Sequence, residues 1–120
     1  MKIGFIGTGK IASAVIEGII KSQSKVNEII ISKRNNKISK NLKKKSKKIT
    51  IYNDNQKIIN KSKWVFLSVT PTVGEKIIKD LKFKSNQIIV SFISTITLSQ
   101  LKKMIKVNTA IVRAIPLPPI

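Results

Sequence analysis

A glycine-rich turn near the N-terminus carries the strongest chemical signal in this sequence. It reads GTGKIA over residues 7–12, directly after a short apolar run, and a helical pattern begins at once. Gly7 permits a tight turn, Gly9 leaves the backbone open to a pyrophosphate, and Ala12 lets a helix pack closely on a strand. The N–H groups at the helix N-terminus then face the phosphates. The pattern predicts a dinucleotide site; the alternative is an ordinary glycine turn between a strand and a helix.

The residues after the second expected strand indicate which dinucleotide is bound. An acidic side chain at this tip holds the ribose 2′-hydroxyl of NAD, whereas basic and hydroxyl groups accept the 2′-phosphate of NADP. The tip carries no carboxylate and offers Ser32, Lys33 and Arg34, of which the arginine can grip a phosphate bidentately. The nearest acid, Glu28, is expected at the opposite edge of the sheet. We therefore expect NADP, with NAD as the alternative cofactor and a solvated loop as the alternative interpretation.

Two further polar segments are expected at the same edge. The fourth expected strand ends in the turn SVTPT at residues 68–72, and Asn55 begins a short helix after the third strand. Both segments are placed to contact a ribose or a phosphate. Ordinary turn and cap chemistry explains these residue types equally well.

The composition removes most of the usual catalytic side chains. The 120 residues include no cysteine and no histidine, and the five carboxylates are scattered along the chain. No pair of them is spaced for acid–base work or for holding a metal. We therefore nominate no catalytic residue and no metal ligand, and expect a bound cofactor to supply the chemistry.

The net charge of +19 raises the alternative of a nucleic-acid partner, because such an excess attracts any polyanion. Of the 24 basic residues 22 are lysines, whereas base-specific contacts favour arginine. The few aromatic residues lie inside apolar runs, which is typical of a core rather than of a base-stacking surface. We expect no specific nucleic-acid partner. No signal peptide or membrane-spanning stretch of about 18 apolar residues is evident, so we expect a cytoplasmic protein outside the membrane.

The periodicity predicts the elements that must position these groups. Continuous runs of Ile, Val and Phe are typical of parallel strands buried on both faces, and they fall at residues 2–6, 28–32, 49–52, 64–69, 88–92 and 109–114. Between them lie five helical patterns. Two cover residues 37–48 and 55–60. The other three show apolar faces at Ile11, Val15 and Ile19; at Val73, Ile77 and Leu81; and, after a Thr97 N-cap, at Leu98, Leu101 and Ile105. This order predicts an α/β, Rossmann-type doubly wound parallel sheet with strand order 3-2-1-4-5-6.

The end of the chain suggests how the domain continues. We expect residues 1–114 to form one dinucleotide-binding domain. Residues 115–120 are apolar and proline-rich, and we expect them to begin the connection to a C-terminal helical domain that this sequence lacks.

Taken together, these residues resemble the N-terminal NAD(P)-binding domain of the pyrroline-5-carboxylate reductase family over essentially the whole chain. The likeness rests on GFIGTGKIASAVIEGII at residues 4–20, the Asp54–Asn55 pair, WVFLSVTP at 64–71, the VSF and ITL segments between 90 and 98, and RAIP at 113–116. The resemblance implies hydride transfer from NAD(P)H to the ring imine of 1-pyrroline-5-carboxylate, which gives L-proline in proline biosynthesis.

The resemblance also implies where the cofactor and the substrate bind. In the family a helical C-terminal domain binds the substrate and forms the homo-oligomer, so we expect this chain alone to be monomeric and inactive. With Lys33 added for its charge, the expected cofactor contacts are Ile6, Gly7, Thr8, Gly9, Lys10, Ile11, Ser32, Lys33, Arg34, Asn55, Val69, Thr70, Pro71 and Ser94.

Three positions depart from the family pattern. Thr70 replaces a common lysine, Thr95 replaces a glycine near the expected nicotinamide end, and Leu117 replaces an asparagine. These departures leave two alternatives open: a diverged reductase that acts on another imine, and a dinucleotide sensor without catalysis.

Overall fold

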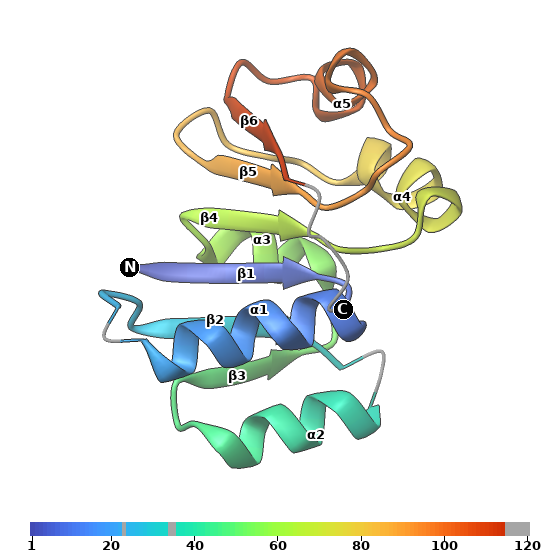
Figure 1. Ribbon diagram of the computed structural model, residues 1–120. Coiled ribbons are helices and arrows are strands. Elements are labelled where there is room, and N and C mark those ends of the chain that lie inside the picture. The colour runs from blue at the N-terminus through green and yellow to red at the C-terminus, as the bar shows by residue number, and fades with distance from the viewer. Residues whose placement is uncertain (23, 34–35, 115–120) are drawn as a thin grey trace.

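The computed structural model describes residues 1–22, 24–33 and 36–114, and these residues build one six-stranded sheet (Figure 1). The strands are β1 (Lys2–Ile6), β2 (Glu28–Ser32), β3 (Ile49–Tyr52), β4 (Trp64–Leu67), β5 (Ile88–Ser91) and β6 (Ala110–Arg113). Every neighbouring pair is parallel, in the order β3-β2-β1-β4-β5-β6. The predicted fold class and strand order are confirmed. All strands therefore end at the same edge, called here the carboxyl edge.

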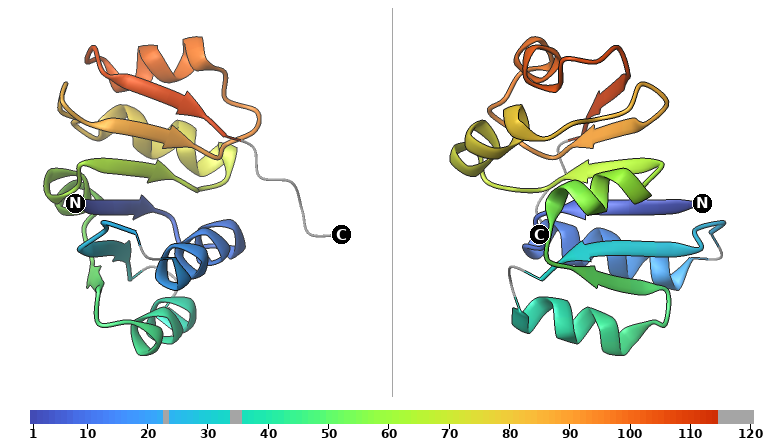
Figure 2. Two further views of the ribbon diagram at one scale, coloured as in Figure 1. Left: turned by 60° about the vertical axis from the view of Figure 1, so that its left-hand side comes forward. Right: turned by 180° about the vertical axis from the view of Figure 1, so that it is seen from behind.

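Helices cover the two faces of the sheet unequally. The helices are α1 (Lys10–Lys21), α2 (Asn36–Lys45), α3 (Asn55–Lys61), α4 (Pro71–Ile77) and α5 (Leu98–Ile105), with a 3₁₀ turn at Ile78–Asp80 after α4. Helices α1 and α2 lie on one face, and α3, α4 and α5 lie on the other (Figures 1 and 2). Within the described residues, no helix has the length and apolar character needed to cross a bilayer.

The strand interiors explain why the sheet is buried on both sides. Successive side chains of a strand point to opposite faces, so a continuous apolar run serves two cores. In β2, Ile29 and Ile31 pack with Ile16 of α1, whereas Ile30 packs with Ile58 of α3. All five side chains are fully buried.

Local signals set several element ends as the sequence predicts. Thr97 is the N-cap of α5: its Oγ1 accepts from Gln100 N at 3.1 Å, and Gln100 Oε1 accepts from Thr97 N at 2.8 Å. Asp54 caps α3 by a single bond, accepting from Gln56 N at 2.9 Å. Cap bonds of this kind satisfy amides that a helix cannot pair internally.

Other predicted boundaries and faces are wrong. The second helix ends at Lys45 rather than at residue 48, and the helix expected to reach Leu81 tightens into its 3₁₀ turn first. The first helix buries Ala12 and Ile16, whereas Ile11 is 44% exposed. The reason is positional: Ile11 lies in the first turn of α1 at the carboxyl edge, where no strand lies beneath it.

One part of the sheet has no helix over it. Helices α1 and α2 do not extend over β4, β5 and β6, and no other described helix lies on that side (Figures 1 and 2). Trp64, Phe66 and Phe92 are only partly buried here, and Val112 is 51% exposed. The rings of Phe66 and Phe92 stack with centroids 5.8 Å apart. These four residues define the open sheet face.

Candidate functional site

The turn between β1 and α1 requires glycine at its first position. Gly7 has φ +94°, in the left-handed region that residues with side chains rarely adopt. A Cβ there would lie 2.7 Å from the Ser68 carbonyl oxygen and 2.8 Å from Val69 Cγ1. Both the backbone conformation and the close approach of the two residues after β4 therefore exclude any larger residue.

The second glycine of the turn serves a different purpose. Gly9 is the N-cap of α1, and its carbonyl accepts from Ser13 N at 3.0 Å. A Cβ on Gly9 would meet no atom within 4 Å, so the space in front of it is open. The fold itself would tolerate a side chain at this position. What Gly9 preserves is free space before the unpaired amides of the first helical turn, where an anion binds readily.

Ser68 joins the end of β4 to the glycine turn. Its Oγ donates to the Gly7 carbonyl at 2.9 Å and to the Ile6 carbonyl at 3.2 Å, and its N–H donates to Ile6 at 2.9 Å. The residues are 61 and 62 positions apart in the chain. Sequence reasoning placed Ser68 in a polar turn but missed this connection, which fixes the shape of the turn.

A cavity of about 470 Å³, the glycine-turn cavity, opens at the carboxyl edge between β1 and β4. Gly7, Thr8, Gly9, Asn36, Ser68, Val69, Thr70 and Val73 line it. Five of the predicted contact residues thus come together from two separate segments. The sequence places Ser68 in a turn expected at this crevice but does not assign Asn36 or Val73 to the site, although Asn36 stands only four residues beyond the end of β2.

Thr8 supplies the test of whether a phosphate group fits this cavity. The residue is 5% exposed, and its Oγ1 has no hydrogen-bond partner among the described residues. Burying a hydroxyl without a partner costs about 1–3 kcal/mol, so such groups are rare. Thr8 is a lining residue of the cavity, and a phosphate bound there would supply the acceptor that its hydroxyl lacks among the described residues. The residues present therefore fit a dinucleotide pyrophosphate.

The remaining predicted contacts around the turn occupy different positions. Ile6 is fully buried, whereas Lys10 and Ile11 are exposed in the first turn of α1. Thr70 is the N-cap of α4 and makes no side-chain capping bond, and Pro71 is the first helical residue. The Thr70 hydroxyl is thus not engaged in capping α4.

The predicted adenosine end lies further along the same edge. Ser32, Lys33 and Asn55 line a second cavity of about 390 Å³ together with Asn53. The Lys33 N–H donates to the Tyr52 carbonyl at 3.0 Å, which ties the tip of β2 to that of β3. Arg34 lies outside the described residues.

Glu28 lies at the opposite edge, as expected, and already makes a hydrogen bond and an ion pair there. Its carboxylate accepts from Thr50 Oγ1 at 2.6 Å and lies 3.5 Å from Lys2 Nζ. The Thr50 hydrogen bond, followed by the Lys2 charge, holds the pKa of the Glu28 carboxyl below its ordinary value. This acid is therefore no ligand for a ribose at the carboxyl edge.

The predicted nicotinamide end is less enclosed. Ser94 and Thr95 follow β5 and are both exposed. The Ser94 carbonyl accepts from Arg113 Nη2 of β6 at 2.6 Å. Among the described residues, Ser94 is not in the lining of the glycine-turn cavity.

A parallel sheet of this strand order, with a glycine turn between β1 and α1, defines a dinucleotide-binding Rossmann fold. Residues 2–95 match the family model described as NADP oxidoreductase, coenzyme F420-dependent. The chain belongs to that family of oxidoreductases.

The similar proteins confirm the resemblance to pyrroline-5-carboxylate reductases. The chain is 33% identical to pyrroline-5-carboxylate reductase 3 of Danio rerio, over 97% of this chain and 41% of the relative. A crystal structure of the Streptococcus pyogenes reductase superposes with a TM-score of 0.82 at 32% identity, over 97% of this chain and 42% of the other. The Plasmodium falciparum reductase with NADP bound gives a TM-score of 0.77 over the same shares, and its 18% identity shows the fold alone. The chain thus spans less than half of the length of each.

Proposed function

We propose that this chain is the cofactor-binding part of an NADP-dependent reductase that converts 1-pyrroline-5-carboxylate to L-proline. The observation that carries the proposal is the glycine-turn cavity. It is lined by Gly9, in front of which the space is open, and by Thr8, whose buried hydroxyl has no partner among the described residues. The names of the similar proteins support the reaction, and the family description supports the cofactor. In this proposal residues 1–114 are the dinucleotide-binding domain. Residues 115–120 lie outside the described residues.

Each predicted contact then has a role in holding the cofactor. The backbone from Ile6 to Ile11 and the Thr8 hydroxyl bind the pyrophosphate, and residues 69–71 form the facing wall. Ser32, Lys33, Arg34 and Asn55 bind the adenosine half, and Ser94 lies toward the nicotinamide. When bound, NADPH supplies the hydride for the imine carbon.

The protein's own contribution is binding and orientation. No titratable side chain is present in the described lining of the glycine-turn cavity, so no proton donor is assigned to this chain. We propose that the substrate carboxylate is bound by a further domain, because the chain spans only 41% of the Danio rerio relative. Holding the cofactor in the correct position and orientation is then the main way in which this chain accelerates the reaction.

The test compares two glycines that stand in equally open space. Gly9 is the N-cap of α1, and Gly18 lies within the helix. A Cβ on either glycine would meet no atom within 4 Å. We expect Gly9→Ala to weaken NADPH binding at least tenfold in a fluorescence titration, because the methyl group occupies the space of the pyrophosphate. Gly18→Ala is the control and leaves the affinity unchanged. If the unmodified chain binds neither NADPH nor NADH, the proposal is wrong.

The exposed nicotinamide end favours a second candidate, a dinucleotide sensor without catalysis. Thr95 is exposed where a glycine is expected to admit the nicotinamide, and Ser94 lies outside the cavity lining. The two candidates separate in one assay on the longest natural form of the protein. Oxidation of NADPH by 1-pyrroline-5-carboxylate supports the reductase, whereas tight binding without turnover supports the sensor.

A further inference from the structure

We propose that the open sheet face is the docking surface for a helix that follows residue 120 in a longer form of this protein. The helix runs back over β6, β5 and β4 and completes the layer that α1 and α2 begin. This inference goes beyond the proposed function, and it holds whichever dinucleotide the chain binds.

The open sheet face is part of a continuous apolar surface. Residues with their side chains on this side of the sheet form two rows that cross β4, β5 and β6 in register. The rows are Trp64–Ile88–Ala110 and Phe66–Val90–Val112. None of these six residues is charged, although the chain carries 24 lysines and arginines. A sheet face that meets water alternates with polar residues on its strands, and this face does not have them.

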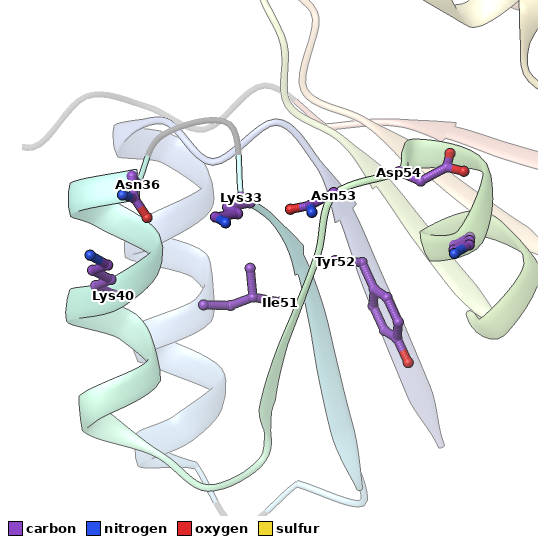
Figure 3. Close-up of a pocket in the computed structure, with 8 residues that line it drawn as sticks. Lys33, Asn36, Lys40, Ile51, Tyr52, Asn53 and Asp54 are labelled. Atoms are coloured by element: carbon purple, nitrogen blue, oxygen red, sulfur yellow. The ribbon is translucent and has the colours of Figure 1, made fainter.

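A bare face is exceptional for a parallel sheet. Parallel sheets occur almost only with both faces covered, and exposed apolar patches mark interaction sites. The covered half of the same layer shows the contact that is missing. Ile51 of β3 points toward α2 and packs against the core cluster that includes Leu42 of that helix (Figure 3). Among the described residues no helix lies over Val112, which is 51% exposed.

The handedness of the connections explains why this face is bare. A connection between parallel strands is nearly always right-handed, so the direction in which the chain moves along the sheet decides which face its helix covers. From β1 to β3 the chain moves one way, and α1 and α2 cover one face. From β3 to β6 it moves the opposite way, and α3, α4 and α5 cover the other face. No right-handed connection between the six strands therefore supplies a helix to the open sheet face.

The same rule restricts what can cover the face. A further parallel strand beyond β6 would again place its connecting helix on the side of α4 and α5. A covering helix therefore belongs to a segment that turns back after β6, and β6 itself borders the face. The chain spans 41% of the Danio rerio reductase and 42% of the Streptococcus pyogenes reductase. A form of similar length contains enough sequence for such a segment.

Charge disfavours a second copy of this chain as the cover. Each copy has a net charge of +19, and pairing through the open sheet face would bring the two excess charges close together. A segment joined to β6 by a short connection meets the face at a high effective concentration instead. The cover that these observations favour is therefore part of the same polypeptide.

The experiment uses the lack of cysteine in the 120-residue sequence. Val112→Cys places a thiol on the open sheet face. The matched control is Leu98→Cys, which places one at the start of α5, where the side chain is 38% exposed on the other side of the sheet. Both variants are made in the 120-residue chain and in the longest natural form. Mass spectrometry of the labelled peptide gives the rate of reaction with iodoacetamide, relative to the rate in denaturant.

We expect the two cysteines to react at similar relative rates in the 120-residue chain. In the longer form Val112→Cys should react about tenfold more slowly or less, because labelling then requires local opening. Leu98→Cys should change by less than about twofold, since its surroundings are the same in both forms.

Several outcomes overturn the proposal. They are an equal rate for Val112→Cys in both forms, slow labelling already in the 120-residue chain, and a natural protein that ends at residue 120. Labelling of the longer form that accelerates on dilution shows that a second copy covers the face, and also overturns it. None of these measurements requires a bound nucleotide, so failure of the proposed function leaves their outcome unaffected.

Discussion

The two ends of the carboxyl edge differ in how far the described residues build them. At the β1–β2–β3 end the sheet is covered on both faces, and three cavities that share lining residues lie between Gly7 and Asn55. At the β4–β5–β6 end one face is open, and Ser94 and Thr95 are exposed. The difference shows that the described residues enclose the proposed nucleotide-binding end of the edge more fully than the end where the reaction is proposed to occur.

The physical reason lies in what each task requires. Phosphates are held by backbone amides, a glycine turn and nearby cations, all of which a few consecutive residues can supply. A reacting centre needs side chains placed by several distant elements, and function depends on that site rather than on the fold. Four substitutions test whether binding and fold stability are divided between the two ends as this comparison implies.

The largest effect is expected at Gly7. Gly7→Ala forces a methyl group against the Ser68 carbonyl, 2.7 Å away, at a φ of +94°. We expect the free energy of unfolding to fall by about 3 kcal/mol, from backbone strain and displacement of β4 together. Chemical denaturation measures this loss. A stability equal to that of Gly18→Ala would contradict the required turn geometry.

Thr8→Val is expected to separate binding from stability. The replacement keeps the shape and removes a hydroxyl that is buried without a partner among the described residues. The ligand-free chain should gain about 1 kcal/mol of stability, because a desolvated polar atom is lost. NADPH affinity should fall about tenfold, since the phosphate loses a hydrogen bond. Thermal unfolding with and without NADPH measures both. A less stable ligand-free variant would show that the hydroxyl is already satisfied.

Glu28→Gln tests the edge away from the site and should affect stability alone. The pKa of Glu28 is lowered in the folded chain, so its carboxylate stabilises the fold at pH values above the unfolded pKa of about 4.3. We expect a loss of about 0.5 kcal/mol at pH 7. The difference from the unmodified chain should shrink as the pH falls through and below 4.3. A difference that stays constant down to pH 3 would exclude the charge as its cause.

Arg113→Ala should have the smallest effect on binding. The substitution removes the hydrogen bond to the Ser94 carbonyl at the β6 end. We expect a stability loss of no more than about 0.5 kcal/mol, because the contact is exposed, and a change of less than twofold in NADPH affinity. A tenfold loss of NADPH binding would show that the β4–β5–β6 end also helps to hold the nucleotide. Arg113→Lys is the control that keeps the charge.

Local patterns in the sequence were sufficient for most of the fold. The glycine turn, the apolar strand runs and the Thr97 cap each act within a few residues, so they predict strand order and several helix starts. The cavity of about 480 Å³ between α2 and β3 (Figure 3) could not be found in this way, because the lysines that line it come from separate parts of the chain: Lys33 from the loop after β2, Lys40 from α2 and Lys57 from α3. Ile11 was misplaced for a related reason, since periodicity does not show where the sheet ends beneath a helix.

The open sheet face also gives the chain an optical reporter. Trp64 is the one tryptophan of the sequence, half-buried at the start of β4 and stacked on Phe66 with centroids 6.3 Å apart. The start of β4 is at the opposite end of the strand from the glycine turn. The wavelength of the Trp64 emission maximum therefore depends on how much water reaches the open sheet face. Anything that covers the face shifts the emission to the blue, while a nucleotide bound at the carboxyl edge leaves its colour unchanged.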